Sequence, residues 1–209
     1  MKPDLRLYLV TDTGLCGARG VPETVRRAVA GGATTVQVRD PNASGRELHE
    51  LVARVRAELV GTGVALLVDD RLDVALTAGA DGVHLGQSDL PVERARAVAG
   101  ANLLVGWSVT CRAELDAANA LPSGVVDYLG IGPVFGTPTK PGHAEPTGVD
   151  GLRELVAASR IPAVAIGGVH ADNAEQVAAT GVGGLCVVSE ICAAADPAAA
   201  AAGLRKVTG

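Results

Sequence analysis

Aromatic residues are scarce in this sequence: they make up 2% of its 209 residues, as one Trp, two Tyr and one Phe. A core of any size must therefore be built from Val, Leu, Ile and Ala, which suit parallel strands covered on both faces. The length is near the lower end for one closed α/β barrel, and it is enough to bury a sizeable core.

Runs of basic residues and long apolar stretches are missing as well. The formal net charge is −5, so nucleic acids and anionic membranes are poor candidate partners, although small anions could bind at a local site. The first apolar run, residues 7–10, is too short for a signal peptide, and no later stretch is long enough to span a membrane. We expect a cytoplasmic protein that acts on small molecules. Its oligomeric state, a homo-oligomer included, stays open.

The cysteines form neither a CxxC motif nor a Cys/His metal spacing. A buried free cysteine behaves as a small hydrophobe, so we expect all four to fill the core of a protein from a reducing compartment. They are Cys16, Cys111, Cys186 and Cys192.

Short apolar runs, β-branched or bounded by glycine, alternate along the whole chain with stretches rich in Ala, Leu, Arg and Glu. The runs predict strands at residues 7–12, 34–40, 64–70, 82–87, 103–109, 127–134, 162–168 and 184–190. The intervening stretches predict helices at residues 22–30, 45–59, 72–78, 92–99, 112–118, 151–158, 172–179 and 197–207. Asp196-Pro197 is a helix start signal, which makes the Ala-rich stretch 193–202 a helix rather than a disordered tail.

Eight strands that alternate with eight helices imply a parallel sheet with right-handed crossovers, and eight units are the number that closes a barrel. No linker or change in composition divides the chain. The fold class is therefore α/β, with a single (β/α)8 TIM-barrel domain over residues 1–209. An open doubly wound sheet is the alternative.

Polar residues gather at the carboxyl ends of the predicted strands, where barrel enzymes place their chemistry. Gln37 and Arg39 lie two residues apart and so share one face of their strand. The alternating Val36 and Val38 suit the helix-covered side, which leaves Gln37 and Arg39 pointing into the barrel mouth. Arg39 could balance a carboxylate there, or its planar guanidinium could bind phosphate oxygens.

Three carboxylates follow neighbouring strands: Asp69 and Asp70 after the third, and Asp89 after the fourth. Converging carboxylates are costly unless a cation or an arginine compensates them. A few oxygen ligands, completed by substrate phosphate, are a common way to hold Mg²⁺. The alternative is that these aspartates are turn or cap residues.

Further polar groups are expected on the same rim. Ser108 lies at the end of the fifth strand without a Gly-x-Ser-x-Gly elbow, so nucleophilic serine chemistry is not expected. The proline-restricted loop after the sixth strand offers Thr137, Thr139 and Lys140 as phosphate donors, unless it is a solvated loop with an incidental lysine. Glycines 167–168, with Ser189 on the next strand, suit a phosphate site.

The histidines include one strand residue, His84, which we interpret as a hydrogen-bonded barrel residue rather than a catalyst. His49 lies in a predicted helix, and the remaining two lie in loops. We assign no general base to any of them.

Several motifs follow one another on successive predicted strands. They are LYLVTD (7–12), VQVR (36–39), GVHLGQSDLP (82–91), GIGP (130–133) continuing to TPTK (137–140), and AIGG (165–168). Taken together, these motifs resemble the thiamine-phosphate synthase family, and the resemblance covers nearly the whole chain.

The resemblance implies condensation of hydroxymethylpyrimidine diphosphate with hydroxyethylthiazole phosphate, or its carboxylated form, to thiamine phosphate and diphosphate. Carried over by position, the Mg²⁺ ligands are Asp70 and Asp89. The pyrimidine diphosphate contacts are Gln37, Val38, Arg39, Asp40, Pro41, Asp69, Ser108 and Lys140. The thiazole phosphate contacts are Thr137, Pro138, Thr139, Gly168, Val188 and Ser189. The catalytic residues are Arg39, Ser108 and Lys140.

Two positions depart from the family pattern, which has Lys in place of Pro41 and Asn in place of Asp69. One positive charge is lost and one negative charge is gained beside a polyanion. We hypothesise that tighter or additional Mg²⁺ coordination neutralises Asp69, while Arg39 and Lys140 bind the anion. Weaker diphosphate binding or a changed substrate is the alternative.

The implied reaction needs no general base. Carbon–oxygen cleavage leaves a benzylic-type cation on the pyrimidine, and the thiazole nitrogen then attacks it. Two other functions stay open: a thiazole tautomerase-like paralogue, which has no need of the metal aspartates, and a non-catalytic protein that binds thiamine phosphate. The presence of Asp70 and Asp89 favours the synthase.

Overall fold

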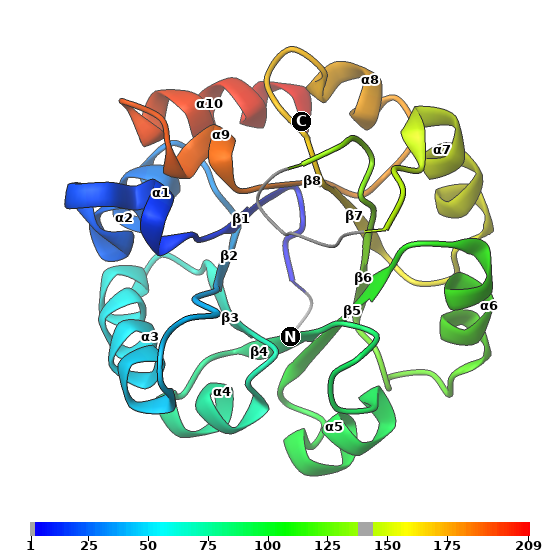
Figure 1. The fold of residues 1–209 in the computed structure, drawn as a ribbon, viewed down its shortest axis with the longest axis horizontal. Coiled ribbons are helices and arrows are strands. Elements are labelled where there is room, and N and C mark those ends of the chain that lie inside the picture. Colours follow the sequence, from blue (N-terminus) through cyan, green and yellow to red (C-terminus); the bar gives the residue numbers. More distant parts are fainter. Residues whose placement is uncertain (1–2, 138–143) are drawn as a thin grey trace.

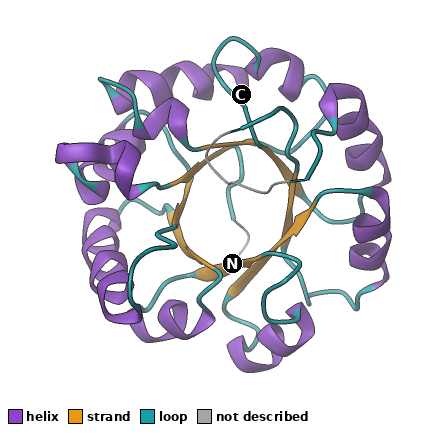
Figure 2. Cartoon of the chain, in the orientation of Figure 1, coloured by secondary structure: helices purple, strands orange, loops and turns teal. Residues whose placement is uncertain are grey.

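The strands close into a barrel, as predicted. The computed structural model describes residues 3–137 and 144–209. Within them, eight parallel strands pair in chain order and β1 pairs with β8, while helices form an outer ring around them (Figures 1 and 2). The open doubly wound alternative is thereby excluded.

The strands are three to six residues long. They are β1 (Leu7–Val10), β2 (Thr35–Val38), β3 (Ala65–Asp69), β4 (Gly82–Leu85), β5 (Leu104–Val109), β6 (Tyr128–Ile131), β7 (Ala163–Ile166) and β8 (Leu185–Val187). The predicted strands mostly run too far at their carboxyl ends, because the polar residues there belong to loops. At β7 the reason is explicit, since Gly167 and Gly168 have φ of +95° and +64°, outside the extended region.

The helices match their predicted ranges closely, and four of them match at both ends. They are α2 (Val21–Ala30), α3 (Gly45–Leu59), α4 (Leu72–Ala78), α5 (Val92–Ala99), α6 (Arg112–Ala120), α7 (Gly148–Ala158), α8 (Ala174–Ala178) and α10 (Pro197–Val207). The start signal of α10 acts as predicted, because the Asp196 side chain accepts from the amides of Ala198 and Ala199. Residues 193–195 precede this cap and are not helical, which corrects the prediction for the whole Ala-rich stretch.

Short helices in two βα loops were not predicted. After β1 come α1 (Thr13–Cys16), capped by the Asp12 side chain, and the 3₁₀ helix η1 (Gly17–Arg19). After β8 comes α9 (Ser189–Cys192), so the prediction of a strand to residue 190 is wrong. Single turns like these are too short to show an apolar period. No helix in the described part of the chain is long and apolar enough to cross a membrane.

The core has two layers, as the alternation along the strands requires. Val36 and Val38 are fully buried in the larger layer, between the barrel and the helices. Tyr8, Leu67 and Tyr128 belong to the smaller layer inside the barrel. Leu5, which precedes β1, joins that inner layer, and the described residues just before β1 accordingly project within the ring of strands in Figure 1.

The cysteines occupy two kinds of environment, and only one of them was expected. Cys16, Cys186 and Cys192 are buried, in agreement with their prediction as core residues. Cys111 is exposed, so that prediction is wrong for this residue. It lies in the loop immediately before α6, at the N-cap position, where no packing layer covers it.

Candidate active site

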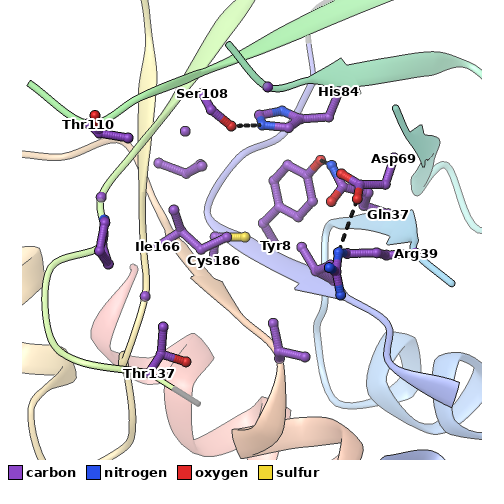
Figure 3. A pocket seen from close by; sticks show the side chains of 18 of the residues that line it. Tyr8, Gln37, Arg39, Asp69, His84, Ser108, Thr110, Thr137, Ile166 and Cys186 are labelled. Carbon is purple, nitrogen blue, oxygen red and sulfur yellow. Dashed lines mark hydrogen bonds and ion pairs between the residues drawn. The ribbon is translucent and has the colours of Figure 1, made fainter. Parts of the chain in front are cut away.

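A cavity of about 520 Å³ opens at the carboxyl ends of the strands (Figure 3). Its walls are contributed by all the strands of the barrel or the loops that follow them. The predicted site residues among its lining are Gln37, Arg39, Asp69, Asp70, Asp89, Ser108, Thr137, Gly168, Val188 and Ser189. The barrel therefore brings together most of the predicted site that the structure describes.

Arg39 and Asp69 form an ion pair on the cavity wall. Arg39 Nε lies 3.1 Å from Asp69 Oδ2, and the two side chains are 18% and 14% exposed. The pairing follows from the parallel register of β2 and β3, which aligns Val38 with Val68 and so brings the next residue of each strand together. The extra carboxylate at position 69 is thus compensated by the arginine predicted to bind the anion.

Asp70 and Asp89 lie on the neighbouring loops after β3 and β4. Asp70 has φ of +60°, the one positive value among the described non-glycine residues, and its amide donates to the carbonyl of His84 at 2.8 Å. Asp89 Oδ2 accepts from the amide of Gly86 at 2.7 Å. A left-handed backbone at a residue other than glycine costs free energy, and such strain is often found at functional sites.

The described part of the cavity lining carries more acidic than basic groups. Asp69, Asp70, Asp89 and Glu114 face it, whereas Arg39 is the one Lys or Arg among these residues. No cluster of three or more His, Cys, Asp or Glu suited to a metal ion occurs within residues 3–137 and 144–209. A cation at this rim would therefore take two carboxylates and complete its coordination from a ligand.

A continuous chain of hydrogen bonds crosses the inside of the barrel beneath the cavity. Gln37 Nε2 donates to the Tyr8 hydroxyl at 3.0 Å, and that hydroxyl lies 2.8 Å from the Tyr128 hydroxyl. Tyr128 Oη lies 2.9 Å from His84 Nδ1, and His84 Nε2 lies 3.0 Å from Ser108 Oγ. Both ring nitrogens of His84 are thus engaged, which confirms its interpretation as a hydrogen-bonded barrel residue. Figure 3 shows the bond between His84 and Ser108.

Burial changes the pKa values of the groups in and beside this hydrogen-bond chain. Both tyrosines are at most 1% exposed, and desolvation raises the pKa of Tyr8 and of Tyr128 well above the ordinary value. Their hydroxyls therefore stay protonated at physiological pH. Desolvation likewise raises the pKa of the Cys186 thiol beside them, so that it is an inert apolar group.

A glycine on β5, Gly106, leaves the space in which this hydrogen-bond chain forms. The parallel registers align His84 with Gly106 and Gly106 with Tyr128. A Cβ atom at Gly106 would lie 2.2 Å from Tyr128 Cζ and 2.5 Å from His84 Nδ1. Glycine at position 106 therefore lets side chains from β4 and β6 meet above the intervening strand.

The part of the cavity wall at the end of β7 is built from the backbone of Gly167 and Gly168, and is called the glycine wall below. Phe135 donates its amide to the carbonyl of Gly167 at 3.0 Å, which holds the loop after β6 against the end of β7. A Cβ atom at Gly168 would lie 2.7 Å from Phe135 Cβ, so packing as well as φ requires glycine there. Next to this wall, His170 Nδ1 pairs with Glu190 Oε2 at 2.9 Å and links the loops after β7 and β8.

Some predicted residues do not line the cavity. Val38 is fully buried on the other side of β2. Pro41 is exposed in a turn, and Asp40 accepts a hydrogen bond from Thr13 Oγ1 at 2.7 Å. Pro138, Thr139 and Lys140 lie outside the described residues.

Other lining residues were not predicted, among them Tyr8, Gln87, Glu114 and His170. Tyr8 had a usable signal: tyrosine is rare in this sequence, and residues 8 and 10 share one face of β1. Glu114 had none, because its place depends on how the loop before α6 folds back, with Glu114 Oε2 accepting from Thr110 Oγ1 at 2.9 Å.

The fold and site define the class of protein: a (β/α)8-barrel enzyme with an acidic, arginine-containing cavity at its catalytic end. Comparison with known proteins identifies the family. The family model for thiamine monophosphate synthase matches residues 7–191, and the chain belongs to this family of transferases. The match covers every strand of the barrel.

Individual relatives agree with this assignment. A thiamine-phosphate synthase from Albidiferax ferrireducens is 45% identical over 203 residues, covering 97% of this chain and 91% of the relative. One from Chloroflexus aurantiacus is 47% identical over 202 residues, covering 97% and 92%. The solved structure of a thiamine phosphate pyrophosphorylase from Pyrococcus furiosus is 41% identical and superposes with a TM-score of 0.88, covering 99% of this chain and 96% of that one.

Proposed function

We propose that this enzyme condenses hydroxymethylpyrimidine diphosphate with hydroxyethylthiazole phosphate, or its carboxylated form, to give thiamine phosphate and diphosphate. Family membership supports the overall reaction, and the cavity supports the substrates. The observation that carries most weight is the convergence of Arg39, Asp70 and Asp89 on one rim. The tautomerase has no need of the two carboxylates, and turnover distinguishes the synthase from a binding protein.

Mg²⁺ fits this rim. Asp70 and Asp89 offer hard oxygen ligands from adjacent loops, and the hydrogen bond from Gly86 holds one oxygen of Asp89 in place while the other can bind a cation. Few protein ligands together with substrate phosphate are typical of Mg²⁺ sites. The excess of carboxylates in the described lining also favours a bound cation. When bound, the ion would stabilise negative charge on the departing diphosphate.

Arg39 and Ser108 are positioned to assist this departure. The guanidinium of Arg39 has five N–H donors and uses Nε toward Asp69, so its terminal nitrogens can bind diphosphate oxygens. Ser108 is held by His84 on the opposite side of the cavity. Donors already in place where charge develops stabilise a transition state without reorganisation. Lys140 belongs to this proposal by resemblance.

The thiazole phosphate belongs on the glycine wall. Gly168, Ser189 and Thr137 line this part of the cavity and offer amide and hydroxyl donors. Anchoring one substrate by its phosphate fixes the direction of its ring nitrogen, and positioning is what the attack on a carbocation needs. No proton has to be removed in that step, so the absence of an assigned general base agrees with the reaction.

A turnover assay with both substrates and Mg²⁺ tests the proposal. Diphosphate release that requires both substrates supports the synthase. Isomerisation of the thiazole substrate alone would assign the tautomerase, and product binding without turnover would assign the binding protein. Arg39→Ala should lower kcat more than it weakens thiazole phosphate binding, and a loss confined to thiazole affinity would contradict the role given to Arg39. Arg112→Ala, at an exposed arginine on α6, is the matched control.

A further inference from the structure

Counting protons limits the interior hydrogen-bond chain to two possible directions. Each tyrosine hydroxyl supplies one proton, and a neutral imidazole carries one N–H. The chain from Gln37 to Ser108 can therefore be completed in only two ways. The two differ in which end of the Gln37 amide meets Tyr8.

In the first arrangement every donor points from Gln37 toward Ser108. The Gln37 amide nitrogen donates to Tyr8, Tyr8 donates to Tyr128, and Tyr128 donates to His84 Nδ1. His84 must then carry its proton on Nε2 and donate it to Ser108 Oγ. The Ser108 proton is left to point into the cavity.

In the second arrangement every donor is reversed. Ser108 donates to His84 Nε2, the imidazole proton sits on Nδ1, and Tyr8 donates to the carbonyl oxygen of Gln37. The cavity then receives no proton from Ser108. A mixed arrangement would leave a buried tyrosine proton without an acceptor, which costs free energy in this unsolvated interior.

We propose that the chain runs from Gln37 to Ser108, and that Tyr8, Tyr128 and His84 are positioning residues which hold the Ser108 hydroxyl as a hydrogen-bond donor to an anion. The amide orientation supports this direction, with Gln37 Nε2 facing Tyr8 at 3.0 Å. So does the chemistry of the site, because a diphosphate accepts protons and offers none when ionised. This second argument rests on the proposed function, whereas the first does not.

The direction also determines what the other end of the chain recognises. Because the Gln37 nitrogen donates to Tyr8, the carbonyl oxygen of this cavity-lining residue is left as an acceptor for a ligand. The two ends of the chain, on β2 and β5, thus differ in character. A ligand that carries an N–H group at one end and an anion at the other matches both, and an aminopyrimidine diphosphate is of this class.

The tautomer of His84 tests the direction in the protein without ligand. ¹⁵N chemical shifts distinguish a protonated ring nitrogen from an unprotonated one, and the His84 signals are assigned by comparison with His84→Asn. At about pH 8.5, some two units above the ordinary histidine pKa, we expect the proton on Nε2 and none on Nδ1. A proton on Nδ1 in the unmodified protein would overturn the proposal.

A matched pair of substitutions sharpens the test. In Gln37→Glu the ionised carboxylate can only accept, so it should reverse the chain and place a proton on His84 Nδ1. Gln87→Glu adds the same charge to the same cavity, but Gln87 bonds the carbonyl of Ser108 rather than the chain, so the tautomer should not change. An unchanged tautomer in Gln37→Glu, or equal changes in both variants, would refute the directed chain. If Gln37→Glu does not fold, the tautomer of the unmodified protein decides alone.

Kinetics of Tyr128→Phe test the consequence for the substrate. This variant leaves His84 Nδ1 without its donor, so Ser108 is no longer held as a donor. We expect kcat/KM for the pyrimidine diphosphate to fall about tenfold, the effect of about one hydrogen bond, with KM for the thiazole phosphate unchanged. Equal losses for both substrates would count against a positioning role. Because the tautomer is measured without ligand, failure of the synthase assay would not affect it.

Discussion

Arg39 and Asp69 neutralise each other at the wall of the cavity, with Nε and Oδ2 3.1 Å apart. The chain thus carries an internal counter-ion at the position where diphosphate is expected to bind. A diphosphate on the terminal nitrogens of Arg39 would therefore share the charge of this guanidinium with Asp69. The ion pair also offers a source of charge compensation for Asp69 other than additional Mg²⁺.

Replacing Asp69 by Asn tests this sharing of charge. The amide keeps the shape of the side chain but releases Arg39, so KM for the pyrimidine diphosphate should fall about threefold, within the range of a part-exposed ion pair. The Mg²⁺ concentration needed for half-maximal rate should not change. Asp73→Asn, which removes an exposed partner of Arg71, serves as the charge-matched control. An increased Mg²⁺ requirement would instead make Asp69 a metal ligand, as hypothesised from the sequence.

The two candidate metal ligands should behave as a unit. Asp70→Asn and Asp89→Asn should each lower kcat/KM by about 100-fold or more, because the charge on the leaving group loses its stabilisation. The double variant should be little worse than either single one. Steady-state rates over a Mg²⁺ titration measure this. Asp116→Asn on α6 is the control. A synthase rate that is unchanged in Asp70→Asn and Asp89→Asn would exclude these residues as metal ligands.

The buried tyrosines should make the protein sensitive to alkali. Folding raises the pKa of Tyr8 and of Tyr128 above the unfolded value of 10.0. The folded state therefore binds more protons than the unfolded state above this pH, and stability falls as pH rises from about 10 toward the folded pKa values. Below pH 10 the contribution is fully present.

Tyrosinate absorbance measures this directly, because the chain has only these two tyrosines. The native protein should show no tyrosinate signal at pH 10, and both residues should ionise together when the protein unfolds. Tyr8→Phe should make the loss of stability with rising pH less steep. Gradual ionisation of one tyrosine in the folded protein would show that the interior chain is open to solvent.

Gly106→Ala should disrupt the interior hydrogen-bond chain, although Gly106 is not a member of it. The new methyl group meets Tyr128 and His84 at 2.2 to 2.5 Å, so we expect a loss of about 1–3 kcal/mol in the free energy of unfolding from overpacking. Urea unfolding followed by Trp107 fluorescence measures it. Gly203→Ala, on an open face of α10, should instead stabilise by up to about 1 kcal/mol. An unchanged free energy of unfolding in Gly106→Ala would mean that Tyr128 can move aside freely.

The fold was predictable from the sequence because its signals are local. β-branched runs identified the strands, and caps such as Asp196 marked where helices begin. The strand ends were less accurate for a physical reason: at the carboxyl ends, positive φ values at Asp70 and Gly167 turn the chain out of the sheet. Single-turn helices such as α9 have no periodic signal.

The site was predictable only in part. Alternation along β2 correctly placed Gln37 in the barrel and Val38 outside it. The pairing of Arg39 with Asp69 depends on the register of two strands, and the contact of Tyr128 with His84 joins strands that are not neighbours. Such relationships exist only once the barrel has closed.

The space above Gly106, which His84 and Tyr128 occupy, limits how this barrel could be rebuilt from parts. Here β5 contributes a vacancy, and the neighbouring β4 and β6 fill it with His84 and Tyr128. A donor unit with any larger residue at position 106 would clash with its new neighbours. Strands β4, β5 and β6 would therefore have to be exchanged together.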